Sequence, residues 1–257
     1  MSVSYLRNRR CVLYAMAFCS LVLTNSALIG QSKNEHGSNR EETKLIDEIA
    51  NRNAPPKRVN CDGSTIPLFP KDYDWREQDR VFKSLGRLEK KSVPKLWEEL
   101  VKKSDDSRYS LTIRDKSSDA PYNESVGFFC YELAYWQLTG VFMRHLPDDP
   151  RPGKDGRSVH LTIIPRNSLK KWREERKNKL MYELQIEIGE LVIKELAKVK
   201  IVAEEEKDRS HKKIEAEIAI LKKSKNPIML QTRTSAFEAI YDSREADRFR
   251  KKLGFDK

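Results

Sequence analysis

The stretch from Val126 to Leu146, VGFFCYELAYWQLTGVFMRHL, decides the class of fold, because it is apolar on nearly every side when wound into a helix. A helix of this kind is buried in the middle of a bundle or inside a membrane. Glu132 lies near its middle and Arg144 near its end, and each charged side chain would cost about 2.5–3.5 kcal/mol at the centre of a bilayer. The stretch therefore predicts the central helix of a helical core, with a membrane span as the weaker alternative.

Helical spacing continues upstream of this stretch. Asp74 is a capping residue type ahead of a predicted helix over WREQDRVFKSLGRLEKK, and Ser92 and Pro94 mark the start of a second helix. The apolar stripes of the two helices consist of Trp75, Phe82, Leu85 and Leu88, and of Val93, Leu96, Trp97, Leu100 and Val101. The large aromatic side chains that we expect to shape the core are Trp75, Trp97, Phe128, Phe129, Trp136 and Trp172.

Two short segments alternate between apolar and polar residues, as strands do. The first is YSLTIRD, with Tyr109, Leu111 and Ile113 on one face, and the second is SVHLTIIP, from Ser158 to Pro165. We expect these segments to pair as a short two-stranded β ribbon on the helical core.

The C-terminal part has the pattern of long helices. From Asn167 onward an apolar stripe runs through Leu169, Trp172, Leu180, Leu184, Ile188, Leu191 and Val199. Residues 204–213, EEEKDRSHKK, have no apolar side chain and are predicted to be an exposed helix tip or a turn. Ile214, Ile218 and Leu221 then restart at coiled-coil spacing, Asn226–Pro227 ends the element, and Thr234 or Ser235 caps a last helix. The fold class is therefore mainly α, with a long C-terminal helical hairpin or coiled-coil-like arm.

The first thirty residues have the pattern of an export signal. Three arginines precede the uncharged run from Cys11 to Leu23, and small and polar residues follow it. Cleavage is expected after Ser26, Ala27 or Gly30. If the segment is not cleaved, residues 11–29 approach the roughly 20 residues that cross a bilayer and would anchor the chain. We expect an exported protein that is periplasmic, secreted or membrane-anchored; a buried N-terminal helix of a cytosolic protein is the alternative.

The remaining chain is predicted to have three parts. Residues 31–72 are polar and contain four of the prolines, which indicates a linker, with one modest helix predicted over EETKLIDEIANRN, where Leu45, Ile46 and Ile49 share a face. Residues 73–165 form the helical core domain, and residues 166–257 form long charged helices. Charged side chains make up 35% of the chain and hydrophobic ones 38%, which excludes a polytopic membrane protein.

Removal of the leader leaves two cysteines, Cys61 and Cys130. In an oxidising compartment they could form one disulfide, whereas a buried free thiol is the alternative for Cys130. No CxxC or HExxH motif is present and the four histidines are far apart in the sequence, so we predict neither a metal nor a cofactor.

The formal net charge is +11, and its excess lies on the C-terminal helices. Residues 165–257 carry 24 basic and 17 acidic side chains, whereas residues 31–164 carry 23 and 22. This excess favours an anionic surface or polymer as partner, unless interspersed Lys and Glu simply solvate the helices. Nucleic acid is not expected, because its binding sites are more densely basic. The candidate contacts form one compact cluster: Lys170, Lys171, Arg173, Arg176, Lys177 and Lys179.

Catalysis is the alternative to a binding role. Glu132 is the carboxylate whose buried setting would raise its pKa, and His145 and His160 flank the loop that follows its helix. A hydrolase-like enzyme could be centred on these three residues. A polar pocket that joins them would favour the enzyme, whereas a filled core would favour an interaction module.

Residues 93–146 carry a resemblance to a known repeat. The stretch VPKLWEELVKKSDDSRYS resembles the first helix and turn of a HEAT-type α-solenoid unit, in Pro94, Leu96, Leu100, Asp105–Asp106 and Arg108. The helix from Val126 would be the second of the pair. The resemblance implies a scaffold or protein-binding surface without catalysis. Because the sequence offers no nucleophile, base and stabiliser that could be combined, we predict a non-enzymatic, exported interaction module of the cell envelope that binds protein partners through its helical faces.

Overall fold

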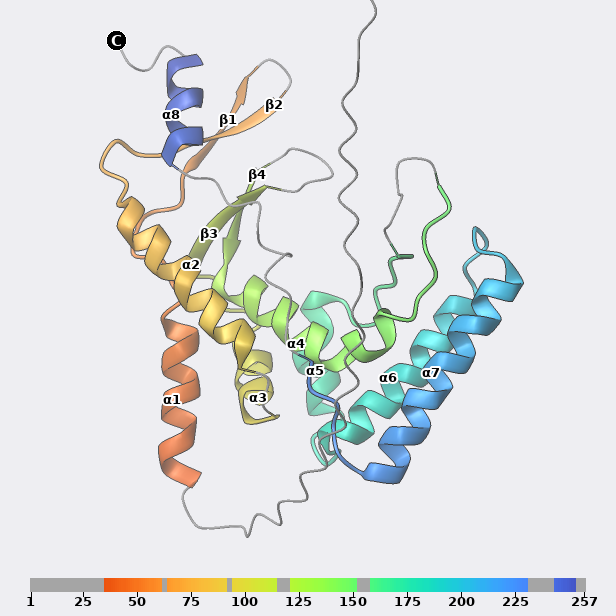
Figure 1. Ribbon diagram of the computed structural model, residues 1–257. Helices are drawn as coiled ribbons and strands as arrows, with labels where there is room; N and C mark the ends of the chain where they lie inside the picture. The colour runs from red at the N-terminus through yellow and green to blue at the C-terminus, as the bar shows by residue number, and fades with distance from the viewer. Residues whose placement is uncertain are drawn as a thin grey trace, which may run out of the picture. The chain divides into compact units, whose positions relative to one another are not determined.

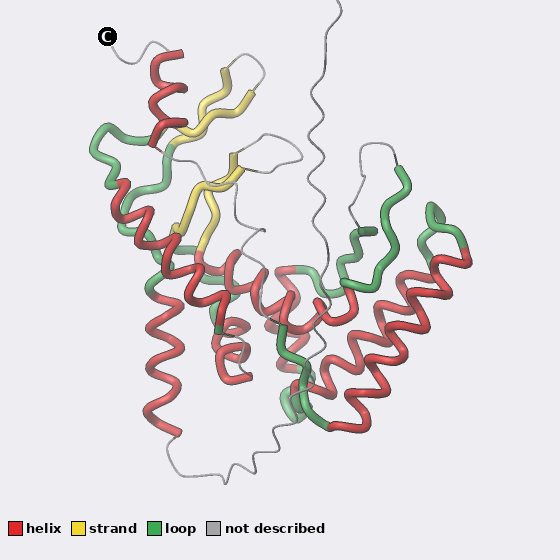
Figure 2. The backbone as a smooth tube through the Cα atoms, in the orientation of Figure 1, coloured by secondary structure: helices red, strands yellow, loops and turns green. Residues whose placement is uncertain are grey.

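The computed structural model describes residues 35–61, 64–91, 94–114, 121–151, 158–230 and 243–252 (Figures 1 and 2). The predicted leader, the anchor over residues 11–29 and the cap at Thr234 or Ser235 lie outside these residues. The described elements are α1 (Glu35–Asp47), β1 (Lys57–Cys61), β2 (Ser64–Leu68), α2 (Trp75–Lys90), α3 (Pro94–Lys102), β3 (Tyr109–Arg114), β4 (Pro121–Ser125), α4 (Val126–Met143), a 3-10 turn η1 (Arg166–Ser168), α5 (Leu169–Glu174), α6 (Met181–Ala197), α7 (Glu204–Ser224) and α8 (Ser243–Lys252). The prediction of a mainly α fold with a short β ribbon is confirmed.

Helix α4 is the central helix, as its all-round apolar sequence predicts. It packs against α1, α3, α6 and α7, and its N-terminus is capped by the Ser125 hydroxyl, which accepts from the Phe128 N–H. Gly127 allows a close approach, because a Cβ at this position would lie 2.6 Å from the Asp106 nitrogen. Among the helices that the structure describes, none is both long enough and apolar enough to cross a membrane.

Helices α2 and α3 begin where the sequence predicts. The Asp74 carboxylate accepts from the backbone N–H groups of Arg76 and Glu77, and α3 starts at Pro94. The predicted α2 stripe is wrong at Phe82, whose side chain is 40% exposed. Val81 is buried instead, with Leu85 and Leu88 at the helical spacing of four and three residues, and Phe82 is turned about 100° from Val81. Of the predicted aromatic core, Trp97 and Phe129 are fully buried, whereas the others, Trp75, Phe128, Trp136 and Trp172, are partly buried.

The predicted hairpin consists of α6 and α7, which lie side by side in Figure 1 and both contact α4. Residues 204–213 belong to α7, so the turn lies at residues 198–203. Helix α7 ends at Lys225, whose left-handed backbone (φ 53°) places its N–H on the Leu221 carbonyl. The hairpin therefore packs on the core through one face of each helix.

The β ribbon has a different partner from the one predicted. Strand β3 pairs antiparallel with β4, with Tyr109 opposite Ser125 and Arg114 opposite Pro121. In the described residues strands occur only in this hairpin and in the hairpin of β1 and β2 (Figure 2). Neighbouring segments pair readily because little chain must be ordered between them.

The second predicted strand, residues 158–165, instead runs extended beside α4. The Tyr131 hydroxyl donates to the Ile164 carbonyl (2.8 Å), and the Tyr135 hydroxyl donates to the Leu161 carbonyl (3.1 Å). The Ile163 N–H donates in turn to the Tyr135 oxygen (3.0 Å). Tyrosine side chains thus satisfy the backbone groups that a strand partner would have satisfied.

The stretch predicted as a linker is folded from Glu35 onward, which corrects the expected boundary at residue 72. It contributes α1 and the β1–β2 hairpin, and Ile46 and Ile49 of the α1 region are completely buried in the main core. Phe69 and Tyr73 form a second, smaller cluster with Ala246 of α8. The described residues belong to one compact unit, with no domain division at residue 165.

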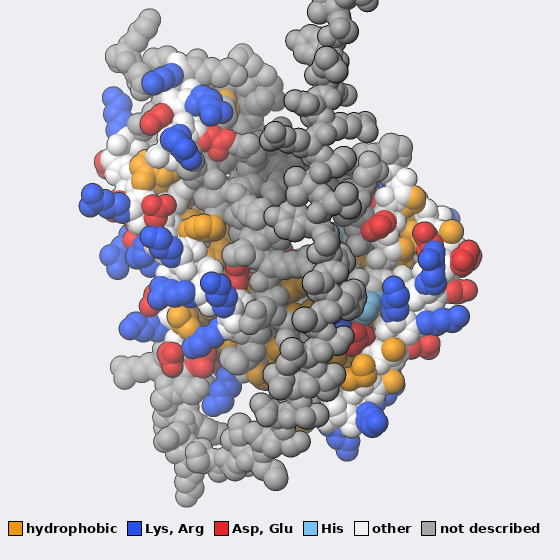
Figure 3. Space-filling model, viewed as in Figure 1, with side chains coloured by type: hydrophobic (Ala, Val, Ile, Leu, Met, Phe, Trp, Pro, Cys, Tyr) orange, Lys and Arg blue, Asp and Glu red, His pale blue; other side chains and the backbone are white. Residues whose placement is uncertain are grey.

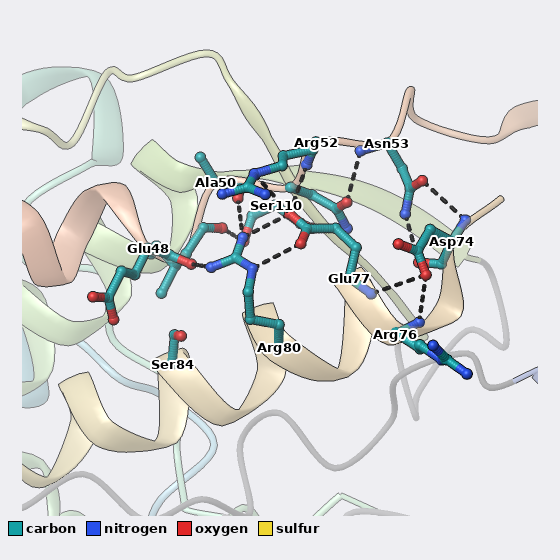
Figure 4. Close-up of polar contacts among 12 residues, drawn as sticks. Glu48, Ala50, Arg52, Asn53, Asp74, Arg76, Glu77, Arg80, Ser84 and Ser110 are labelled. Carbon is teal, nitrogen blue, oxygen red and sulfur yellow. Dashed lines mark hydrogen bonds and ion pairs between the residues drawn. The ribbon is translucent and has the colours of Figure 1, made fainter.

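Arg80 of α2 fixes the end of α1 (Figure 4). Its guanidinium donates to the backbone carbonyls of Glu48 (2.6 Å) and Ala50 (2.8 Å), in the turn that directly follows α1. The Glu77 carboxylate accepts from Arg80 (2.7 Å) and from the Arg52 N–H (3.0 Å). The charges of Glu77 and Arg80 compensate each other, so we assign this contact a structural role.

Candidate functional site

The main candidate site is a cleft of about 670 Å³ between one face of α4 and the extended residues 158–161. We call it the α4 cleft. Its lining residues are Glu132, Tyr135, Trp136, Thr139, Met143, Arg144, Leu146, Ser158, Val159, His160, Leu161 and Leu230. Its volume lies within the usual range of ligand sites, about 300–1,000 Å³.

Helix geometry places the first wall. Residues 132, 135, 136, 139 and 143 follow at steps of three, one, three and four, so they share one face of α4. The Thr139 hydroxyl donates to the Tyr135 carbonyl (2.7 Å) and is therefore already satisfied within the helix.

The second wall is held by backbone and amide hydrogen bonds. The Val159 N–H donates to the Pro147 carbonyl (2.8 Å), and Tyr135 holds the chain at Leu161. Near Leu230, the Gln185 side chain exchanges two hydrogen bonds with the backbone of Ile228 (2.8 and 2.9 Å). Both sides of the cleft are therefore fixed by the core.

Glu132 is the uncompensated charge of the α4 cleft. It makes no hydrogen bond or ion pair with any described residue, and burial together with the charge of Glu124 raises the pKa of its carboxyl above the ordinary value. Arg166 opposes this shift, but its own guanidinium bonds the Ser125 hydroxyl (2.8 Å) and lies over the Phe128 ring. A carboxylate without a partner in a cleft is a candidate binding or acid–base group.

Arg144, at the other end of the cleft, is compensated. Its guanidinium bonds the Glu217 carboxylate of α7 (2.6 Å), and the same oxygen lies 3.0 Å from His145 Nε2. His145 lines a separate polar pocket of about 270 Å³, with Arg209, Ser210 and Lys213 among its lining.

The three residues of the hydrolase hypothesis are thus divided. Glu132 and His160 line the α4 cleft together with Ser158, whereas His145 joins α4 to α7 outside it. No hydrogen bond among the described residues links Ser158, His160 and Glu132 to one another. The cleft holds residue types of a hydrolase but not the hydrogen-bonded arrangement that activates a nucleophile.

Most of the predicted basic cluster is paired with acids. Lys170 contacts Asp105, and the remaining pairs are Arg173–Glu98 (2.7 Å), Arg176–Glu187 (2.6 Å), Lys177–Glu174 (3.6 Å) and Lys179–Glu187 (2.7 Å). Lys171 has no acidic partner among the described residues. Basic and acidic side chains are likewise interspersed over the face in Figure 3. Local pairing therefore offsets the attraction to an anionic polymer that the charge count suggested.

The cysteines have separate environments. Cys130 is a free thiol at the centre of the core, and burial raises its pKa to about 12. Cys61 lies in β1, and its side chain is outside the described set. The Cys61–Cys130 disulfide therefore stays a prediction.

The sequence pointed to Glu132 and His160 but missed the cleft that they share. The face of α4 also contributes Tyr135, Met143 and Arg144 to the cleft, and a loop far along the chain contributes Leu230. The i, i+3, i+4 spacing from Glu132 was the available signal for the residues of α4.

No cluster of His, Cys, Asp and Glu in the described residues is arranged to hold a metal ion. In comparisons with known proteins, no family model, no curated protein and no solved structure matches this chain.

Proposed function

We propose that the protein is an exported, non-enzymatic helical interaction module of the cell envelope, and that it binds a protein partner through the α4 cleft. The observation that carries this proposal is Glu132, a carboxylate without a hydrogen-bond or ion-pair partner among the described residues, in a cleft whose other lining residues are mostly aromatic and apolar. Such a combination of one charged group and apolar surroundings gives both affinity and orientation to a bound partner. Export is supported by the basic, apolar and small-residue order of residues 1–30.

Site-specific photocrosslinking tests the partner. We would replace Met143, in the cleft, with p-benzoylphenylalanine in cells that produce the full chain, and Lys212, on the exposed surface of α7, as the matched control. We expect a discrete crosslinked protein from position 143 and none from position 212. Equal labelling from both positions, or none from position 143, would contradict the binding role.

Intact-mass measurement of the protein recovered from each cell fraction tests export. We expect material outside the cytoplasm whose mass corresponds to cleavage after Ser26, Ala27 or Gly30, or full-length material in the membrane fraction. Full-length protein confined to the cytosol would contradict export but leave the cleft proposal standing.

A hydrolase is the second candidate, because Glu132 and His160 line one cleft and the carboxyl pKa is raised. A hydrolase would lose turnover of p-nitrophenyl esters and amides in the Glu132→Gln and His160→Ala variants. The interaction module predicts the same background rate in the wild-type protein and in both variants. A rate that falls at least about a hundredfold in either variant would favour the enzyme.

A further inference from the structure

We propose that the α4 cleft binds an extended peptide segment that is basic and apolar, with a Lys or Arg side chain held against Glu132 between Tyr135 and Trp136. This inference rests on the proposed interaction role and specifies the chemistry of the partner. It assigns the protein a cationic ligand, although the chain itself carries a net charge of +11.

The charged residues that line the cleft indicate that the ligand is positively charged. Arg144 is neutralised by Glu217 at 2.6 Å, whereas Glu132 has no hydrogen-bond or ion-pair partner among the described residues. Glu124 is a second acidic group near Glu132; it forms an ion pair with Arg166 (4.0 Å), whose charge also acts on Glu132. Burial removes water from the Glu132 carboxylate. A cation placed there would form an ion pair with it, whereas an anion would be repelled.

The aromatic residues favour an organic cation over a bare ion. Tyr135 and Trp136 lie on the same face of α4 as Glu132, one helical turn along. Aromatic faces attract ammonium and guanidinium groups and also pack against the apolar stem of Lys or Arg. The Tyr135 hydroxyl is already engaged by Leu161 and Ile163, so its ring is fixed in place.

The length of the cleft favours a peptide over a small amine. Glu132 and Arg144 are twelve residues apart on and just beyond α4, which corresponds to about 18 Å along a helix axis. An extended peptide of about five residues has the same length. Between the two ends, the apolar lining residues are Met143, Leu146, Val159, Leu161 and Leu230. These residues can receive the apolar side chains of such a peptide, while a small amine would fill only the end at Glu132.

The test uses a randomised octapeptide library screened against the full-length protein. We expect the selected peptides to share one Lys or Arg flanked by apolar residues. The best peptide is then synthesised with its basic residue intact and with norleucine in its place. We expect Glu132→Gln to weaken binding of the basic peptide about tenfold or more, and to leave the norleucine peptide nearly unchanged. This non-additivity reports a direct contact, which a purely structural effect of the substitution would not produce.

Two variants complete the design. Glu205→Gln removes the same charge from an exposed position on α7 and is expected to bind like the wild type. Glu132→Asp keeps the carboxylate and is expected to retain part of the affinity. Glu132→Gln is neutral, as the buried carboxyl is when protonated, so we expect it to fold; a thermal melt confirms this.

The inference is overturned if no peptide is enriched, if the enriched peptides are acidic, or if Glu132→Gln weakens the basic and norleucine peptides equally. Its failure is distinguishable from failure of the proposed function. A crosslinked partner at position 143 without basic-peptide binding rejects the inference alone, whereas the absence of both rejects the interaction role as well.

Discussion

Gln137 on α4 is a fully buried amide whose nitrogen and oxygen both lack hydrogen-bond partners among the residues that the structure describes. A buried polar group left in this state costs about 1–3 kcal/mol. Gln185, on the facing helix α6, is buried to the same degree. Its side-chain amide donates to the backbone carbonyls of Gln137 (3.1 Å) and Ile228. We therefore expect substitution of the two glutamines to change the stability of the protein in opposite directions.

We predict that Gln137→Met stabilises the protein by about 1–2 kcal/mol, because methionine has a similar shape and no unsatisfied polar atoms. Gln185→Met is the control and is expected to destabilise by about 1–3 kcal/mol, because it leaves backbone groups of Ile228 unpaired. Urea unfolding of both variants measures the change. A loss of stability in Gln137→Met would show that this amide has a partner after all.

Glu89 on α2 is another buried group, and both of its carboxylate oxygens lack hydrogen bonds to the described part of the chain. Burial raises the pKa of its carboxyl from 4.5 to about 7. The folded state therefore holds a proton between these values that the unfolded state has lost. This group makes the free energy of unfolding fall as pH rises from about 4.5 to about 7, and leaves it low above that range.

We predict that Glu89→Gln removes this decline. The variant is expected to match the wild type near pH 4.5 and to exceed it by up to about 3 kcal/mol at pH 8, as the shift in pKa implies. Urea unfolding at intervals of pH measures the difference, with the exposed Glu205→Gln as a variant that should follow the wild-type profile. A difference that does not depend on pH would mean that Glu89 is already ionised in the folded protein.

At the scale of helices, Gly189 allows α6 to approach its neighbours closely. A Cβ at this position would lie 2.8 Å from Phe142 Cε1 on α4 and 2.8 Å from Ile218 Cγ1 on α7. Read in the sequence alone, this glycine only interrupts a helix at a modest cost. In the structure it lies at the meeting of three helices, so helix propensity and packing oppose each other there.

We predict that packing prevails and that Gly189→Ala destabilises the protein by about 1–3 kcal/mol, since overpacking costs more than the propensity gain of roughly 1 kcal/mol. Gly86→Ala on α2 is the matched control, because nothing lies within 4 Å of a Cβ there. That variant is expected to gain about 0.5–1 kcal/mol. Thermal unfolding compares the two, and a gain in both would indicate that α4 and α7 move apart without cost.

Patterns among residues near in the sequence predicted the helices better than they predicted which strands pair. The α2 cap at Asp74, the start of α3 at Pro94 and the buried α4 depend on residues near in the sequence, and all three are confirmed. The partner of β3 was wrong because strand alternation does not say what satisfies the backbone; at residues 158–165 two tyrosines of α4 do so. The α4 cleft likewise depends on residues far apart in the sequence, since Leu230 lines it and Gln185 of α6 bonds the backbone of Ile228 nearby.

For the whole molecule, the main difference between sequence and structure concerns residues 31–72. Their prolines and polar composition are typical of a linker, and the apolar face of Leu45, Ile46 and Ile49 predicted only one modest helix within it. Ile46 and Ile49 are completely buried, and Arg80 of α2 fixes the chain that follows α1. Burial of a few large side chains can outweigh a polar composition, because each contributes about 1.5–3 kcal/mol.

We predict from this that Ile49→Ala lowers the global stability by about 2–4 kcal/mol, since it leaves a cavity in the main core. Tryptophan fluorescence is the appropriate readout of global unfolding, because the four tryptophans include Trp97, which lies on α3 in the same core. Ile220→Ala, at a side chain that is 53% exposed on α7, is the control and is expected to change stability by less than about 0.5 kcal/mol. If Ile49→Ala left the unfolding monitored by fluorescence unchanged, α1 would be an independent segment and the boundary near residue 72 would have to be restored.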